Sequence, residues 1–244
     1  MSKYQFRWIS VFCMAFLAIL LIPACQSETQ LPAEERLSFT TDSGLEIAGT
    51  IYRPTDREPP WPGVLLLHMI YGQRQDWDAF GKTLAQNGLA ALAIDLRGHG
   101  ETGGEMEWEL TRLDLDQVWE AFGELPEIDP NRSAVIGASM GANMAVLLGA
   151  DQPGVRALVL LSPGVNYYQV LTPKPLAEYG ERPVLIIASQ EDAYAASSAE
   201  ELLKYARGEA QLEMFTEIGH GTQMLANQPN LTTLILEWLQ PVLQ

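Results

Sequence analysis

The sequence has few cysteines, few histidines and few basic side chains, and each shortage excludes a class of protein. Two cysteines in 244 residues are too few for a disulfide scaffold or a cysteine-based metal site. The three histidines are too few and too scattered for a zinc site. Only 15 Lys and Arg residues stand against 31 Asp and Glu, and the net charge of −16 opposes binding to phosphate backbones. We therefore expect no metal, no cofactor and no nucleic-acid partner.

Long apolar runs are also scarce, and the one at the N-terminus is short for a membrane span. It covers Trp8 to Ile22 and follows the basic residues Lys3 and Arg7. A span needs about 20 apolar residues. A shorter run with a basic start and a small residue at its end is typical of a secretory signal peptide. An uncleaved anchor is one alternative interpretation, and a plain signal peptide without lipidation is the other.

The end of this run, Ile22-Pro23-Ala24-Cys25, resembles the bacterial lipoprotein box. The resemblance implies that residues 1–24 are a removed signal peptide and that Cys25 carries the lipid. Residues 25–36 are then the lipidated cysteine and a polar tether, and residues 37–244 are the folded domain. The protein is expected in the bacterial cell envelope, attached to a membrane through Cys25 and facing the periplasm or the exterior.

Strand-like and helix-like stretches alternate through residues 37–244. This order predicts one α/β domain with a mostly parallel central sheet and helices on both faces. Ligands bind beyond the carboxyl ends of the strands in such sheets, so candidate site residues are sought there. The expected strands are 37–41, 45–52, 64–68, 89–94, 133–136, 155–161, 184–188 and 212–215, and the expected helices are 76–87, 109–125, 140–150, 197–206 and 231–239. The helix 197–206 is expected to begin with a capping box of Ser197 and Glu200.

Gly137-Ala138-Ser139-Met140-Gly141 is a G-x-S-x-G element between an expected strand and an expected helix. A sharp strand-to-helix turn needs small flanking residues and presents its serine at the edge of the sheet. Helix N-termini favour negative charge, so an oxyanion could develop beside Ser139. The pattern predicts that Ser139 is a nucleophile.

A serine nucleophile needs a base and a group that orients the base. His220, in the glycine-flanked loop after the last strand, is the candidate base. The acid should follow a strand between Ser139 and His220. Asp192 is the preferred candidate after the strand 184–188, and Glu191 is its competitor one residue away.

Two backbone N–H groups are expected to form an oxyanion hole. The first belongs to Met140, the residue after the nucleophile. The second comes from the loop after the strand 64–68, where Met69 is preferred and Ile70 is the alternative. His68 is then expected to hold this loop in place.

These residues together resemble the α/β-hydrolase superfamily, and more closely its dienelactone-hydrolase-like branch of small bacterial hydrolases. The resemblance covers residues 37–240 and implies the triad order Ser139, Asp192, His220 and a structural role for His99. Founding dienelactone hydrolases use a cysteine nucleophile, so Ser139 favours general ester hydrolysis instead. The matching segments are LLLHMIYGQRQDW (65–77), DLRGHGET (95–102), DPNRSAVIGASMGAN (129–143), IIASQEDAY (186–194) and EIGHGTQML (217–225).

The connection between the strands 155–161 and 184–188 is too short for a cap domain, so no sizeable lid is expected. Within it, Asn166, Tyr167, Tyr168 and the stretch Pro173–Pro175 are expected to line or shade the pocket, although the two tyrosines could equally be packing residues. The predicted function is hydrolysis of small carboxylic esters through an acyl-enzyme. One alternative is a peptidase or amidase on the same triad, with Arg74 or the acidic residues at 101–109 holding a peptide terminus. Another is a catalytically silent, lipid-anchored binding protein.

Overall fold

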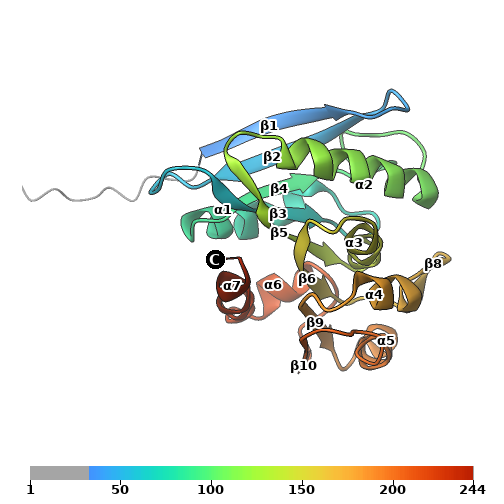
Figure 1. The fold of residues 1–244 in the computed structure, drawn as a ribbon. Coiled ribbons are helices and arrows are strands. Elements are labelled where there is room, and N and C mark those ends of the chain that lie inside the picture. The colour runs from blue at the N-terminus through green and yellow to red at the C-terminus, as the bar shows by residue number, and fades with distance from the viewer. Residues whose placement is uncertain (1–32, 244) are drawn as a thin grey trace, which may run out of the picture.

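A computed structural model describes residues 33–243, and the expected signal peptide and Cys25 lie outside them. Eight strands form one sheet in the order β1-β2-β4-β3-β5-β6-β9-β10 (Figure 1). The pairs β1–β2 and β2–β4 are antiparallel, and the other pairs are parallel. The strands are β1 (Ala33–Thr40), β2 (Glu46–Arg53), β3 (Trp61–Leu67), β4 (Ala90–Ile94), β5 (Ile128–Ala138), β6 (Val155–Leu161), β9 (Val184–Ser189) and β10 (Ala210–Phe215).

Helices cover both faces of the sheet, as the sequence predicts (Figure 1). In β3, Leu65 and Leu67 pack into a core with α2–α5, whereas Val64 and Leu66 pack into a second core with α1 and α7. Successive side chains of a strand point to opposite faces, so a strand between two helical layers must be apolar throughout. The helices are η1 (Arg74–Trp77), α1 (Asp78–Gln86), α2 (Trp108–Gly123), α3 (Met140–Asp151), α4 (Pro173–Tyr179), α5 (Ala193–Leu202), α6 (Gln223–Asn227) and α7 (Leu231–Val242).

Several element boundaries differ from the prediction by a few residues, among them the start of β5 at Ile128 rather than 133, and two of the differences bear on the site and its surroundings. The first strand begins at Ala33 rather than residue 37, because its antiparallel pairing with β2 extends to the pair Ala33–Arg53. Residues 33–36 do not alternate between apolar and polar side chains, so the sequence pattern does not indicate a strand there. Helix α5 begins at Ala193 rather than 197, so the predicted capping box is wrong. The Asp192 side chain accepts from the backbone N–H of Ala195 and caps the helix in place of Ser197. Ser197 lies inside the helix, where its hydroxyl donates to the Tyr194 carbonyl.

The connection between β6 and β9 contains a small hairpin and one short helix, and no cap domain. The hairpin pairs β7 (Asn166–Tyr167) with β8 (Val170–Leu171), and α4 follows it directly. Across residues 33–243, no helix combines the length and hydrophobicity that a membrane crossing requires. The carboxyl ends of the parallel strands therefore face outward with only the hairpin and loops around them.

Candidate active site

Ser139 occupies a strained turn between β5 and α3. Its φ of 52° and ψ of −115° are unusual for a residue with a side chain. A Cβ on Gly137 would lie 2.2 Å from the Gly141 carbonyl oxygen, and one on Gly141 would lie 2.2 Å from that of Leu67. Only glycine fits at either position. The missing side chains let the strand and the helix approach closely, and the turn between them holds Ser139 in this conformation. Ser139 is 4% exposed at the start of α3.

His220 and Asp192 meet beyond the ends of β9 and β10. The Nδ1 of His220 is hydrogen-bonded to Oδ2 of Asp192. The other Asp192 oxygen accepts from the Ala195 N–H at 3.4 Å, so the carboxylate is fixed by the helix that it caps. The loop of His220 also approaches the turn that holds Ser139, because a Cβ on Gly221 would lie 3.5 Å from Cβ of Ala138.

Glu191 points to a different part of the same loop. Its carboxylate accepts from the Ser189 hydroxyl and, at 3.5 Å, from the backbone N–H of Gly219. Ser189 in turn accepts from the N–H of Ile218 at 3.1 Å. The hydrogen bond from Ser189 is the main cause that lowers the pKa of Glu191 to about 2. The structure therefore brings Asp192 to His220, and uses Glu191 to hold the loop that carries His220.

His68 holds the loop where the second oxyanion donor is expected. Its Nε2 accepts from the Leu96 N–H at 3.0 Å, so the ring proton is on Nδ1, which donates to the Met69 carbonyl at 2.7 Å. Burial lowers the pKa of His68 to about 4, and the ring is neutral at pH 7. Met69 and Ile70 follow in a turn that the N–H of Gly72 closes on the Met69 carbonyl at 2.9 Å. On the other side of Ser139, Met140 opens α3, and the first N–H groups of a helix have no partner within it.

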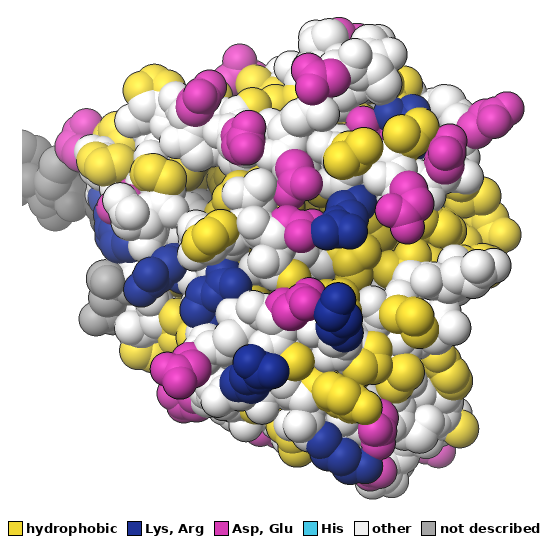
Figure 2. All heavy atoms as spheres, turned by 45° about the vertical axis from the view of Figure 1, so that its right-hand side comes forward, with side chains coloured by type: hydrophobic (Ala, Val, Ile, Leu, Met, Phe, Trp, Pro, Cys, Tyr) yellow, Lys and Arg dark blue, Asp and Glu magenta, His cyan; other side chains and the backbone are white. Residues whose placement is uncertain are grey.

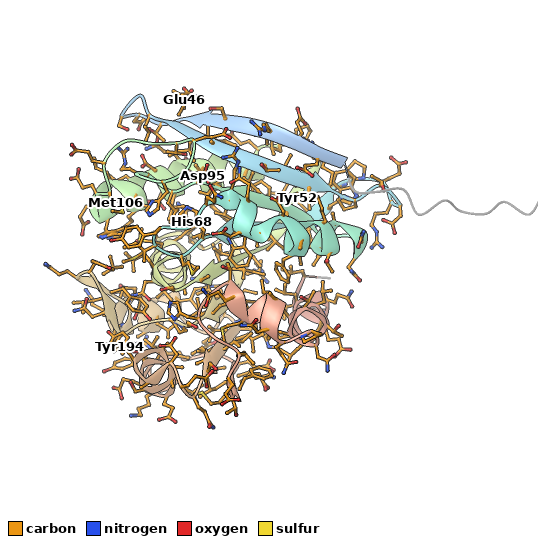
Figure 3. All side chains as sticks on the ribbon, turned by 180° about the vertical axis from the view of Figure 1, so that it is seen from behind. Glu46, Tyr52, His68, Asp95, Met106 and Tyr194 are labelled. Atoms are coloured by element: carbon orange, nitrogen blue, oxygen red, sulfur yellow. The ribbon has the colours of Figure 1, made fainter. Side chains whose placement is uncertain are left out.

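A buried ion pair joins this loop to the next one. The Asp95 carboxylate accepts from the backbone N–H of Arg74 at 2.6 Å and from that of Glu101 at 2.8 Å, and it pairs with the Arg74 guanidinium. Arg74 is only 1% exposed and also pairs with Glu101 at 2.9 Å. Arg74 therefore has no exposed surface with which to bind a peptide terminus. The suggestion that Arg74 does so in a peptidase is wrong. Asp95 and His68 lie at the same end of the sheet (Figure 3).

His99 packs within the fold, as the resemblance implies. Its Nδ1 donates to the Arg97 carbonyl at 2.9 Å, and its ring contacts those of His68 and Trp108 at centroid distances of 4.9 and 6.3 Å. Within residues 33–243, no group of three or more His, Cys, Asp or Glu side chains is arranged to hold a metal ion.

Tyr167 is a site residue whose role the sequence left open. Its hydroxyl is close enough to the Ser139 side chain for the two groups to interact, and it donates to the Ser162 carbonyl at 3.3 Å. Burial, with a smaller effect from the negative charge of Asp192, raises the pKa of Tyr167, which keeps the hydroxyl protonated. The sequence indicates this role only through the two adjacent tyrosines at 167–168, and such a pair is equally compatible with lining a pocket and with packing inside the fold.

Comparison with known proteins defines the class. Residues 59–182, about half of the chain, match the hydrolase family described as serine aminopeptidase, S33, and the chain belongs to that family. Esterase FrsA of Yersinia enterocolitica is 35% identical over 138 residues, which are 54% of this chain and 32% of that protein. Esterase FrsA of Yersinia pestis is 33% identical over the same shares. The chain thus spans about a third of the length of these relatives.

Solved structures give the fold. Dienelactone hydrolase from Anabaena variabilis has a TM-score of 0.73 at 20% identity, covering 88% of this chain and 100% of that one. Est1E from Butyrivibrio proteoclasticus, determined with ferulic acid bound, has a TM-score of 0.70 at 17% identity over 84% and 96% of the two chains. The α/β-hydrolase fold is therefore confirmed, and the chain is a serine hydrolase by family.

Proposed function

We propose that this hydrolase cleaves small carboxylic esters through an acyl-enzyme on Ser139. The observation that carries the proposal is the hydrogen-bonded pair of His220 and Asp192 in a loop that lies against the strained turn of Ser139. The esterase names of the FrsA relatives favour an ester over a peptide. The family description favours a peptidase, which is the second candidate.

The proposed reaction has two halves. His220 takes the hydroxyl proton of Ser139 as the oxygen attacks the ester carbonyl, and the N–H groups of Met140 and Met69 stabilise the oxyanion. The C–O bond to the alcohol then breaks, and His220 gives its proton to the leaving oxygen. Water, deprotonated by the same imidazole, attacks the acyl carbon. The bond from that carbon to Oγ of Ser139 then breaks, His220 returns its proton to Oγ, and the acid is released. Asp192 keeps the His220 proton on Nδ1 and stabilises the imidazolium.

The test compares the purified protein with Ser139→Ala and, as a matched control, Ser197→Ala on the surface of α5. Hydrolysis of p-nitrophenyl acetate, butyrate and octanoate is measured beside fluorophosphonate labelling. We expect Ser139→Ala to abolish both activities and Ser197→Ala to change neither. Labelling without ester turnover would favour the peptidase. A folded wild-type protein with neither activity would favour a silent binding protein.

We also propose that Cys25 is lipidated and anchors the protein in the bacterial cell envelope, facing the periplasm or the exterior. The basic start, the apolar run and Ile22-Pro23-Ala24-Cys25 support this. Two or more acyl chains are needed for stable anchoring. Metabolic labelling with an alkyne-tagged palmitate should mark the wild-type protein and not Cys25→Ala, and only the wild type should sediment with membranes. Equal labelling of both would contradict the proposal.

A further inference from the structure

The β7–β8 hairpin is fixed to the helix that begins beside the nucleophile. Asn143, fully buried in the first turns of α3, donates from Nδ2 to the Val170 carbonyl at 3.0 Å and accepts at Oδ1 from the Gly164 N–H at 2.9 Å. Thr172 closes the base of the hairpin by donating to the Gly164 carbonyl at 2.7 Å. These hydrogen bonds hold the hairpin against α3, the helix that begins directly after Ser139.

The tip of this hairpin presents a tyrosine in a conformation that tyrosine rarely adopts. The two residues between the strands, Tyr168 and Gln169, have φ values of 48° and 70°. Turns with positive φ at both central positions normally use Asn and Gly, because a Cβ is disfavoured there. A strained residue at the edge of a catalytic site points to a function for its side chain. Tyr168 is 58% exposed, so its position is not explained by burial.

Tyr168 forms an exposed ring pair with Trp108, the half-buried first residue of α2. Their ring centroids are 6.2 Å apart at an interplanar angle of 42°. Tyr168 comes from the connection after β6 and Trp108 from the one after β4, so the rings join loops from both sides of β3 and β5. Tyr167, adjacent to Tyr168, donates its hydroxyl to the Ser162 carbonyl at 3.3 Å, and the preceding residue, Leu161, accepts from the Ser139 N–H at 2.8 Å. The ring pair therefore lies at the same end of the sheet as Ser139.

Acidic side chains flank Trp108 along the chain. Glu105, Glu107 and Glu109 are exposed on both sides of Trp108. Figure 2 shows a patch of hydrophobic side chains on this side of the molecule, with acidic side chains and some Lys or Arg side chains along its border. Aromatic faces carry negative charge density as well, and they stack on other rings. A flat apolar ring is favoured at such a surface, and a carboxylate is repelled.

We propose that Trp108 and Tyr168 form an aromatic subsite that binds an uncharged aromatic ring of the ester substrate. The proposal rests on the proposed esterase function and adds the substrate class. The ring stacks on the exposed tyrosine face while the ester carbonyl reaches Ser139.

The test uses two pairs of esters that differ only in a ring, with acid release followed in a pH-stat. Methyl 3-phenylpropanoate is compared with methyl butanoate, and benzyl acetate with ethyl acetate, so that a ring on either side of the ester is examined. We expect the wild type to prefer the ring-bearing member of at least one pair by about tenfold in kcat/KM. Tyr168→Ala should remove most of this preference and leave the ring-free ester within about twofold.

Tyr168→Phe, which retains the ring, should restore the preference, and Trp108→Ala should lower it. Leu171→Ala, an exposed position on the same hairpin, is the matched control and should change neither rate. A carboxylate on the phenyl ring should slow hydrolysis, and added salt should reduce that penalty. The proposal is overturned if the wild type shows no ring preference, or if Tyr168→Ala slows both members of a pair equally. Failure of the esterase function would look different, because the wild type would then hydrolyse no ester of either kind.

Discussion

Asp192 and Glu191 are adjacent carboxylates with different partners, since Asp192 bonds to His220 and Glu191 bonds to Ser189 and Gly219. Neutralising each in turn therefore separates an effect on catalysis from an effect on the loop that carries His220. Asp192→Asn replaces the oxygen that faces His220 Nδ1 with an NH₂ group. The imidazole must then present a lone pair at Nδ1 and carry its proton on Nε2, where it cannot accept the Ser139 proton. A wrong tautomer of this kind lowers kcat by about 10⁴-fold, or about 5 kcal/mol of transition-state stabilisation.

Folding should be almost unaffected by this substitution. The second Asp192 oxygen caps α5 through the N–H of Ala195, and asparagine caps helices about as well as aspartate does. Glu191→Gln is the matched control, because it neutralises the neighbouring carboxylate and keeps an acceptor for Ser189 and Gly219. We expect kcat to fall by less than about tenfold in Glu191→Gln.

The assay is kcat for p-nitrophenyl butyrate between pH 5 and pH 9, with urea unfolding of each variant. Glu191 has a pKa of about 2 and stays charged throughout this range, so Glu191→Gln should keep the shape of the wild-type pH profile. A larger loss of kcat in Glu191→Gln than in Asp192→Asn would refute the assignment. A loss below about a hundredfold in a folded Asp192→Asn protein would refute the tautomer argument.

Three further predictions concern the groups around the site. Asp95→Asn leaves the buried Arg74 guanidinium without its main partner and should lower the free energy of unfolding by about 3–5 kcal/mol in urea denaturation; a loss below about 1 kcal/mol would contradict it. Tyr167→Phe should lower kcat/KM about three- to tenfold by removing the hydroxyl beside Ser139, whereas Tyr168→Phe should not. Stability should fall by about 2 kcal/mol from pH 7 to pH 5, because His68 has a folded pKa of about 4 and takes up a proton near pH 6.5 only when unfolded; a flat profile in urea denaturation would refute this.

The parts of the site that depend on backbone geometry could be predicted from the sequence. Gly137 and Gly141 flank Ser139, which has a positive φ. The small residues that such a tight turn requires can be recognised directly in the sequence. The parallel sheet follows in the same way from apolar runs such as those of β3 and β6, because a strand covered on both faces has no polar side. These features need no knowledge of side-chain direction.

The parts that depend on side-chain direction could not be predicted. Asp192 and Glu191 both follow β9, and only the start of α5 at Ala193 turns one carboxylate toward His220 and the other toward Gly219. The β7–β8 hairpin also gave no signal, because its strands have two residues each and its turn lacks the usual Asn and Gly.

The early start of β1 limits how far the catalytic domain can lie from a lipid surface. With a lipid on Cys25, only residues 26–32 separate the anchor from the strand that begins at Ala33. Even fully extended, that stretch spans at most about 28 Å. The enzyme would then work within roughly its own width of the bilayer and sample a thin layer of the envelope rather than its full depth. Substrates released from, or dissolved near, that membrane would reach it first.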